Sequence, residues 1–316
     1  MEQNEKIKIV YVVGPTASGK TRLSVELANI LNAEIISADS MQIYKNMDIA
    51  TAKPTKEEMQ GIVHHLIDFV DPAEKFSVAE YVKLARAKIE DIHKRGKQII
   101  VCGGTGFYID SLMKNVEFYS ENSDLDLREK LKQEAIEKGP KYLIDKLAEF
   151  DEESAKRIHP NNIKRVIRAI EVYYTTGITM TEHIKNSEVT KSIYNNCIIG
   201  LNFKNRGILY DRINTRVDVM IQNGLVNEAR NVFKSDYDIT AISAIGYKEL
   251  KAYLDGNESL EDAVNRVKME SRRYAKRQLT WFKRNKDIHW IYVDEERDMD
   301  IIVSLASKFI KEDFKI

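Results

Sequence analysis

The segment GPTASGKT at residues 14–21 constrains the fold of this chain most strongly. It matches the phosphate-loop pattern G-x-x-x-x-G-K-[ST], and it lies between an apolar, β-branched run at Ile7–Val13 and a segment of helical spacing at Thr21–Leu31. Backbone N–H groups of such a loop and the helix N-terminus bind an anion, the lysine adds a point charge, and the threonine hydroxyl can contact Mg²⁺. The sequence therefore predicts a phosphate site at Gly14, Pro15, Thr16, Ala17, Ser18, Gly19, Lys20 and Thr21, with Thr21 as the metal contact.

Further strands and helices alternate after this loop. Ala33–Ala38 and Gln98–Cys102 read as buried strands separated by a helix over Val78–Arg95, and Tyr194–Phe203 returns to strand character before a last edge strand at His289–Val293. This alternation predicts an α/β fold: a parallel sheet like that of the phosphate-loop NTPases, flanked by helices.

The middle of the chain changes character. Asp124–Tyr174 is almost continuously helical in pattern, with breaks only at Gly139, Pro140 and Pro160. We expect an all-helical insertion domain at residues 116–190, inside a core formed by residues 1–115 and 191–316. Three more helical segments follow in the second part of the core: Arg206–Lys234, Thr240–Leu254 and Leu260–Lys286.

Charge is balanced over the chain, with 49 Lys and Arg residues and 49 Asp and Glu residues, but it is not balanced locally. Between Val264 and Lys286 there are nine basic residues and one acid, Glu270. Such a run is equally consistent with a solvated helix face and with nucleic-acid binding. Tyr274, Trp281 and Phe282 could stack on bases, but their helical spacing favours core packing.

Two cysteines without a disulfide or zinc pattern, and no run of about 20 apolar residues, predict a cytoplasmic protein outside the membrane.

Two features lie at predicted strand ends beside the loop. Asp39 follows the second strand, where its carboxylate could serve as a general base, bind Mg²⁺ through water, or act as an N-cap for the next segment. The turn Gly103–Gly106 follows the strand at Gln98–Cys102 and contains the Thr105 hydroxyl. That strand does not end in the aspartate typical of nucleotide hydrolases, so the sequence indicates a phosphate-binding enzyme more securely than an ATPase. His64 and His65 are adjacent in a strand-like segment and are interpreted as structural.

The motifs together resemble a known family, the bacterial tRNA dimethylallyltransferases. The resemblance is carried, in family order and over nearly the whole chain, by GPTASGKT at 14–21, ISADSMQIYKNMDIATAKP at 36–54, HHLID at 64–68, GGTGFY at 103–108, IHPNNIKRVIRAIEVY at 158–173, AIGYKEL at 244–250 and RRYAKRQLTWFK at 272–283.

The resemblance implies transfer of a prenyl group from dimethylallyl diphosphate to N6 of the adenosine 3′ of the anticodon, with Mg²⁺ as cofactor. By that similarity the phosphate loop grips the diphosphate, Asp39 is the general base, and Thr105 and Arg128 lie near the reacting groups. The family's loop is also described as nucleotide-binding. We expect a monomer. The residues expected to contact the anticodon stem-loop of tRNA lie in three segments: Asp39, Ser40, Met41 and Gln42; Lys164, Arg165, Val166, Ile167 and Arg168; and Arg273, Lys276 and Arg277 in the basic Arg272–Arg284 helix.

Three alternatives stay open at the level of the residues. A small-molecule kinase shares the loop and the acid, but it needs no basic C-terminal helix. A prenyltransferase acting on free adenine nucleotides needs no RNA surface. A non-catalytic tRNA-binding protein leaves Asp39 beside a phosphate loop unexplained.

Overall fold

The computed structural model of the chain describes residues 6–114, 124–188, 192–296 and 298–316. The chain divides into two compact units: residues 1–113 with 193–316 form the first, and residues 114–192 form the second. The domain boundaries predicted from the sequence, at 115/116 and 190/191, lie outside the described residues.

The first unit is built on a parallel sheet, which confirms the predicted α/β fold. Its strand order is β3-β2-β4-β1-β5-β6, and every neighbouring pair runs parallel. The strands are β1 (Lys8–Val13), β2 (Ala33–Ser37), β3 (His64–His65), β4 (Gln98–Gly103), β5 (Asn195–Asn202) and β6 (Ile288–Tyr292). The predicted return strand and the predicted edge strand are confirmed as β5 and β6. Strand β3 contains only the two histidines, which the sequence analysis places in a strand-like segment without assigning it to the sheet.

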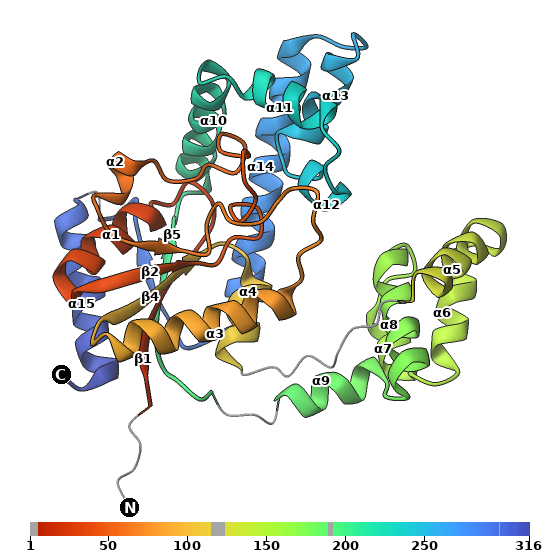
Figure 1. The fold of residues 1–316 in the computed structure, drawn as a ribbon, viewed down its shortest axis with the longest axis horizontal. Helices are drawn as coiled ribbons and strands as arrows, with labels where there is room; N and C mark the ends of the chain where they lie inside the picture. Colours follow the sequence, from red (N-terminus) through yellow and green to blue (C-terminus); the bar gives the residue numbers. More distant parts are fainter. Residues whose placement is uncertain (1–5, 115–123, 189–191, 297) are drawn as a thin grey trace, which may run out of the picture. The chain divides into compact units, whose positions relative to one another are not determined.

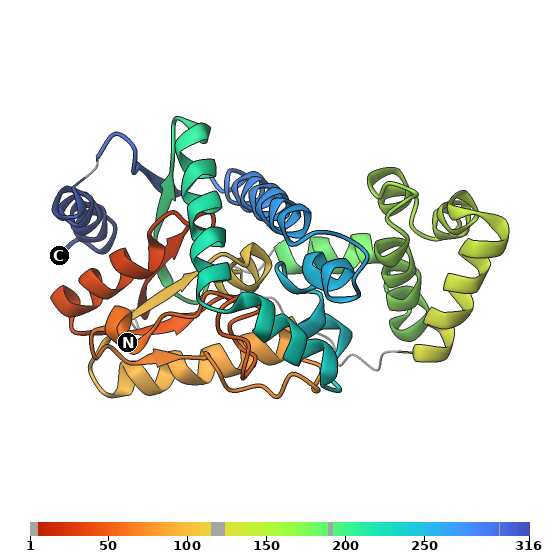
Figure 2. The same cartoon turned by 90° about the horizontal axis from the view of Figure 1, so that it is seen from above.

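Helices cover both faces of this sheet (Figures 1 and 2). Helices α1 (Lys20–Leu31) and α15 (Met299–Phe314) share one apolar core with the sheet, in which Leu27 and Ile310 are buried against Val10. Helices α3 (Val78–Lys94) and α4 (Gly106–Met113) cover the other face. Strand β1 is buried on both sides, which explains its unbroken apolar sequence. Helix α15 was not predicted.

A second group of helices stands beyond the carboxyl ends of the strands (Figure 1). It comprises α10 (Arg206–Gln222), α11 (Leu225–Lys234), α12 (Ile239–Ile242), α13 (Tyr247–Leu254) and α14 (Leu260–Phe282). Gly224 and Gly246, with φ of 99° and 111°, divide segments that the sequence pattern predicts as single helices. The connection from β2 to β3, which contains α2 (Lys56–Met59), packs against this group through Ile43 and Met47.

The second unit is all-helical, as the sequence predicts. It contains α5 (Leu125–Lys138), α6 (Pro140–Ala148), α7 (Glu152–Arg157), α8 (Ile163–Thr176) and α9 (Met180–Glu188). Gly139, with φ of 85°, ends α5, and Pro140 occupies the first turn of α6. Leu131, Leu143 and Ile170 meet in an apolar core that belongs to this unit alone.

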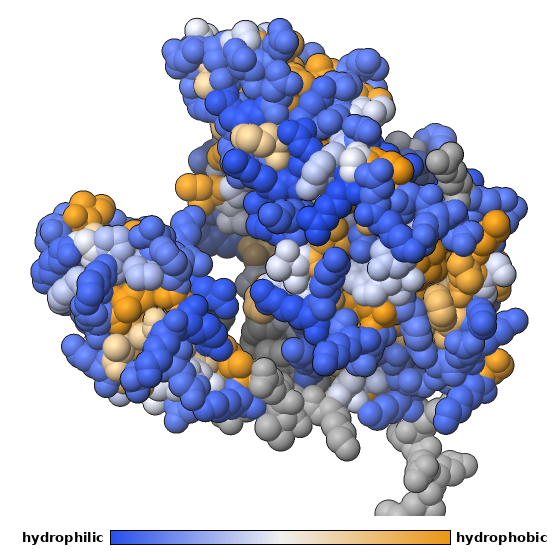
Figure 3. Space-filling view, turned by 180° about the vertical axis from the view of Figure 1, so that it is seen from behind, coloured by the Kyte–Doolittle hydropathy of each residue, from blue (hydrophilic) through white to orange (hydrophobic). Residues whose placement is uncertain are grey.

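Charged and polar side chains dominate the face of each unit seen in Figure 3. Among the residues that the structure describes, no helix combines the length and apolarity needed to cross a bilayer. Cys102 and Cys197 are both free thiols.

His65 hydrogen-bonds the buried Glu34 carboxylate at 2.7 Å and His64 contacts the Ile62 carbonyl at 2.9 Å, so the structural interpretation of the two histidines is confirmed.

Candidate active site

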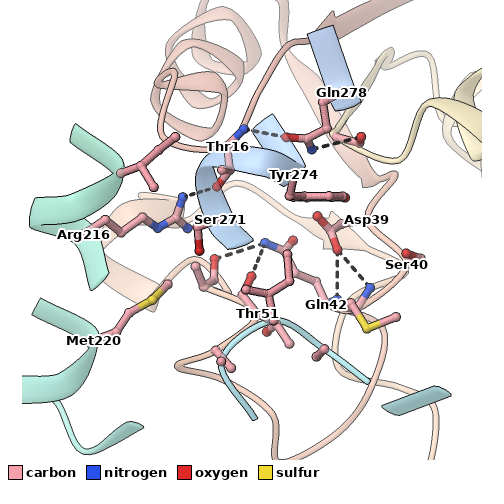
Figure 4. Close-up of a pocket in the computed structure, with 18 of the residues that line it drawn as sticks. Thr16, Asp39, Ser40, Gln42, Thr51, Arg216, Met220, Ser271, Tyr274 and Gln278 are labelled. Atoms are coloured by element: carbon pink, nitrogen blue, oxygen red, sulfur yellow. Dashed lines mark hydrogen bonds between the residues drawn. The ribbon is translucent and has the colours of Figure 1, made fainter. Parts of the chain in front are cut away.

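The phosphate loop, Asp39 and the glycine turn meet at the carboxyl edge of the sheet, since they follow β1, β2 and β4. They border a pocket of about 340 Å³. Helices α10 and α14 close the pocket from the other side with Arg216, Ser271 and Tyr274 (Figure 4). The pocket therefore combines elements that are far apart in the sequence.

The phosphate loop has the backbone conformation that anion binding requires. Gly14, Ala17 and Gly19 all have positive φ, at 143°, 62° and 94°. No side chain caps the N-terminus of α1, so its first N–H groups point to the loop without a side-chain acceptor. The Lys20 ammonium donates a hydrogen bond of 2.8 Å to the Pro15 carbonyl, and burial lowers its pKa to about 8. A bound anion would reverse that shift, because it favours the charged ammonium.

Two arginines of α10 contact the loop, and the sequence reasoning missed both. Arg216 donates from Nη1 to the Thr16 hydroxyl at 2.9 Å, and Arg212 donates from Nε to the Ala17 carbonyl at 2.9 Å. Burial lowers the pKa of Arg216, while the negative charge of Asp39 opposes that effect. Their four-residue spacing beside the apolar Ile213 and Val217 was the available signal, since it places both guanidinium groups on one helix face.

Asp39 lines the pocket and also holds its own loop. Its Oδ1 accepts hydrogen bonds from the backbone N–H groups of Met41 at 2.9 Å and Gln42 at 3.3 Å. Residues 40–43 form a turn, and Tyr44 forms an isolated bridge with Val70. Asp39 therefore caps the segment that follows it, but that segment is a turn and not a helix. The predicted segment Asp39–Gln42 lies entirely along the pocket.

The glycine turn fixes Asp39 through Thr105. The Thr105 hydroxyl accepts a hydrogen bond of 3.0 Å from Ser40 N–H, and Thr105 N–H donates to the Ala38 carbonyl at 3.1 Å. A Cβ on Gly103 would stand 2.2 Å from the Ala38 carbonyl oxygen, so only glycine permits this approach of the two strand ends. The predicted residue Thr105 therefore lies directly beside the segment that carries Asp39.

Helix α14 supplies polar groups that the sequence reasoning did not assign to the pocket. Gln278 accepts a hydrogen bond from Thr16 N–H at 2.9 Å and donates to the Gly104 carbonyl at 3.0 Å, which joins the phosphate loop to the glycine turn. Tyr274 lines the pocket; burial, and then the charge of Asp39, raise its pKa. The expectation that Tyr274 packs in the core is corrected, whereas Phe282 is buried as predicted.

The far end of the pocket is aliphatic. It is formed by Val217, Met220, Leu225, Ala244, Ile245 and Val267. The neighbouring wall, residues 48–50, is held by one carboxylate: Glu228 accepts hydrogen bonds from the N–H groups of Asp48, Ile49 and Ala50 at 2.8–2.9 Å. The pocket thus changes from cationic at the phosphate loop to apolar at the opposite end.

The basic residues of α14 have different surroundings. Arg277 is exposed, lines the pocket mouth and lies 5.7 Å from the centre of the Tyr274 ring. Arg273 is exposed and pairs with Glu270 at 2.6 Å, and Lys276 is exposed on the neighbouring face. All three predicted RNA contacts therefore present their charges to solvent.

The remaining predicted residues belong to the helical unit. Arg128 donates twice to the buried Glu171 carboxylate, at 2.7 and 2.9 Å, and Arg168 donates to the same group at 2.7 Å. Burial opposes ionisation of Glu171, but these hydrogen bonds hold its pKa below the ordinary value. Lys164 and Arg165 are exposed. The side chains of Val166 and Ile167 are buried in the core of this unit. The prediction that these two residues contact RNA is therefore corrected: their side chains are not available for such a contact.

The fold and the pocket define a phosphate-loop α/β protein in which the Asp39 carboxylate and the loop line one pocket. The model of the IPP transferase family matches residues 42–285, more than half of the chain. The chain belongs to this family.

Two tRNA dimethylallyltransferases illustrate the similarity in sequence. The one from Caldanaerobacter subterraneus subsp. tengcongensis is 53% identical over 310 residues, which cover 96% of this chain and 98% of that protein. The one from Bacillus subtilis is 50% identical, covering 94% of this chain and 95% of that protein.

Solved structures agree with this assignment. A tRNA isopentenylpyrophosphate transferase from Bacillus halodurans matches with a TM-score of 0.72 and 44% identity, covering 98% of this chain and 99% of that one. A eukaryotic dimethylallyltransferase acting on tRNA matches with a TM-score of 0.81 and 30% identity, covering 98% of this chain and 79% of that one.

Proposed function

We propose that this chain transfers the dimethylallyl group of dimethylallyl diphosphate to N6 of adenosine 37, the nucleotide 3′ of the anticodon in tRNA, and releases diphosphate. One observation carries the proposal: a single pocket combines a cationic phosphate loop, the Asp39 carboxylate and an aliphatic end. A prenyl diphosphate has the matching chemistry, an anion joined to a hydrocarbon. The tRNA dimethylallyltransferases that match over nearly the whole chain add further support.

The reaction forms an N–C bond and breaks a C–O bond. The exocyclic amine of adenine is a weak nucleophile because its lone pair is delocalised into the ring. Asp39 accepts the N6 proton as the amine attacks the allylic carbon, and the diphosphate departs with the electron pair of the C–O bond. Thr105 fixes the segment that carries Asp39 through Ser40, and Arg128 contacts the reacting groups when tRNA is bound.

Leaving-group stabilisation comes from the phosphate loop and its neighbours. The N–H groups of the loop, the Lys20 ammonium and the Arg216 guanidinium are positive groups held in place before substrate arrives. An allylic carbon tolerates positive charge, so stabilising the departing diphosphate lowers the barrier directly.

The donor set beside the loop suits Mg²⁺. Among the described residues, no group of three or more His, Cys, Asp or Glu side chains is arranged to hold a metal ion. Mg²⁺ does not need one, because it keeps several waters and binds through one or two protein oxygens together with substrate phosphates. The Thr21 hydroxyl and the Asp39 carboxylate line the same pocket and would hold it. The ion would supply positive charge to the diphosphate oxygens.

tRNA recognition uses surfaces on both units. Adenosine 37 must leave the stack of the anticodon loop to reach the pocket, which costs a few kcal/mol. Phosphate contacts offset that cost: Arg273, Lys276 and Arg277 supply them from α14, and Lys164 and Arg165 from α8. We also propose that the enzyme works as a monomer, in the cytoplasm where its RNA substrate is found.

Incubation with labelled dimethylallyl diphosphate and unmodified tRNA, followed by nucleoside analysis, tests the proposal. We expect label in N6-(dimethylallyl)adenosine, and none after incubation with AMP alone. Prenylation of AMP in preference to tRNA would indicate an enzyme acting on free nucleotides. Phosphate transfer from ATP to a small acceptor would indicate a kinase.

A further inference from the structure

An exposed aromatic residue, Phe107, lies next to the glycine turn and has no role in the chemistry described above. It is 50% exposed, although it occupies the first turn of α4, two residues after Thr105. Its ring packs edge-on against Trp281 of α14, with ring centroids 6.3 Å apart and an interplanar angle of 66°. Phe107 therefore contacts the Trp281 ring while half of its surface is exposed.

The platform formed by Phe107 and Trp281 is rigid. Trp281 donates from Nε1 to the Asp110 carboxylate at 2.9 Å. A Cβ on Gly106 would stand 2.3 Å from the Trp281 ring, so the two helices touch at this point. These contacts restrain the Trp281 ring, against which Phe107 packs.

The same face of α14 leads from the pocket to this platform. Gln278 contacts Gly104 at the pocket, and Trp281 contacts Gly106 and Phe107 three residues further on, about 4.5 Å along the axis. Arg277 lies over Tyr274 at the pocket mouth, and Arg284 lies 5.3 Å over the Trp281 ring beside the platform. Arginine and aromatic side chains therefore alternate along one line that starts at the proposed reaction centre.

This combination fits single-stranded RNA. Bases stack on aromatic rings, while arginine pairs with phosphates or stacks on bases. When a nucleotide is flipped out, its neighbours in the loop lose a stacking partner. We infer that Phe107 stacks on a nucleobase adjacent to the reacting adenosine and replaces the stacking that flipping removes. This inference rests on the proposed function and extends it, since it assigns a reason why the substrate is an RNA loop and not a free nucleotide.

The test compares Phe107→Ala with wild type on three anticodon stem-loop RNAs: one intact, one abasic at the nucleotide 5′ of the reacting adenosine, and one abasic at the nucleotide 3′ of it. We expect Phe107→Ala to bind the intact RNA roughly 5- to 150-fold more weakly, while Phe107→Tyr retains affinity. On the RNA that lacks the stacked base, wild type and Phe107→Ala should bind equally. The KM for dimethylallyl diphosphate should not change.

The matched control is Ile30→Ala, which truncates another exposed apolar residue, 61% exposed on α1. It should bind all three RNAs as wild type does, and thermal unfolding confirms that each variant is folded. Equal affinity of wild type and Phe107→Ala for the intact RNA, or the same loss on all three RNAs, overturns the stacking inference while leaving the proposed function intact. Failure of wild type to prenylate the intact RNA overturns both.

Discussion

The side chain of Gln278 accepts a hydrogen bond of 2.9 Å from Thr16 N–H, across 262 residues of sequence. The same amide donates a hydrogen bond to the Gly104 carbonyl. One side chain of α14 therefore links the phosphate loop to the glycine turn and fixes the distance between them. Gln278 is buried, and water therefore cannot easily replace either hydrogen bond. The proposed anion site and the segment that carries Asp39 are coupled through it.

We expect Gln278→Leu to lower the free energy of unfolding by about 1–3 kcal/mol, because Thr16 N–H and the Gly104 carbonyl lose their partner in a buried position. Affinity for dimethylallyl diphosphate should also fall. Gln278→Glu keeps an acceptor for Thr16 but adds a negative charge near the bound anion, so it should weaken binding further with a smaller loss of stability. Thermal unfolding and equilibrium binding separate the two effects. Equal behaviour of both variants would contradict the bridging role.

The lowered pKa of Lys20 predicts a pH-dependent affinity for the prenyl diphosphate. In the free protein Lys20 loses its proton as the pH rises through about 8, whereas a bound diphosphate holds the proton and raises that pKa. Binding above pH 8 therefore takes up a proton, and affinity should fall by up to about tenfold per pH unit. Titration between pH 7 and 9.5 measures this slope. Lys20→Met should bind weakly at every pH and show no such slope above pH 8; a wild-type slope in that variant would assign the effect to another group.

Local sequence patterns predicted the parts of the site that one segment builds alone. The phosphate loop, Asp39 at a strand end and the Thr105 turn each follow from a strand and its next few residues. Arg216 and Gln278 were missed because they reach Thr16 from 200 and 262 residues away. Helical spacing shows which face of a helix a residue occupies, but it does not show which distant segment that face meets. The side chains of Val166 and Ile167 are buried, which the family motif does not reveal, because a motif marks a whole segment while the 3.6-residue period of α8 decides which of its side chains face the core.

The exposed cations of α14 predict a change in salt dependence. Replacing Arg273, Lys276 and Arg277 with Gln should weaken tRNA binding. It should also reduce the magnitude of the slope of log affinity against log salt concentration by roughly 2–3, because fewer phosphate contacts mean that fewer counterions are released on binding. The matched control replaces Lys308, Lys311 and Lys315 with Gln, which removes the same charge from exposed positions on α15 and at its C-cap. Filter binding at several salt concentrations measures both slopes. An identical decrease in the two triple variants would point to net charge and not to contacts of α14.

Arg128 and Arg168 form a matched pair for testing the proposed contact of Arg128 with the reacting groups. Each donates to the buried Glu171 carboxylate, so replacing either with Gln should lower the stability of the helical unit. Only Arg128→Gln should also reduce kcat at saturating tRNA, by roughly tenfold or more if it loses an interaction specific to the transition state. Thermal unfolding and steady-state kinetics provide both measurements. A similar kcat in the two variants would leave Arg128 with a structural role alone.

Asp39→Asn separates proton transfer from binding. The amide has the size of the carboxylate, and its Oδ1 can still accept hydrogen bonds from Met41 and Gln42 N–H, so the turn at residues 40–43 should keep its conformation. It cannot accept a proton at neutral pH. If Asp39 is the general base, turnover should fall by roughly 10²–10⁴ while tRNA and dimethylallyl diphosphate bind within a few-fold of wild type.

Asp39→Ala is the companion variant, because it removes the turn hydrogen bonds as well as the base. We expect it to match the turnover defect of Asp39→Asn and to add a loss of stability of about 1 kcal/mol. If Asp39 acted mainly through Mg²⁺, raising the Mg²⁺ concentration would restore much of the rate in Asp39→Asn, whereas a missing base is not replaced by metal. Single-turnover transfer at two Mg²⁺ concentrations, measured beside tRNA affinity, distinguishes these roles. A wild-type transfer rate in Asp39→Asn would exclude Asp39 as the base, and the N6 proton would then have to leave to water or to the departing diphosphate.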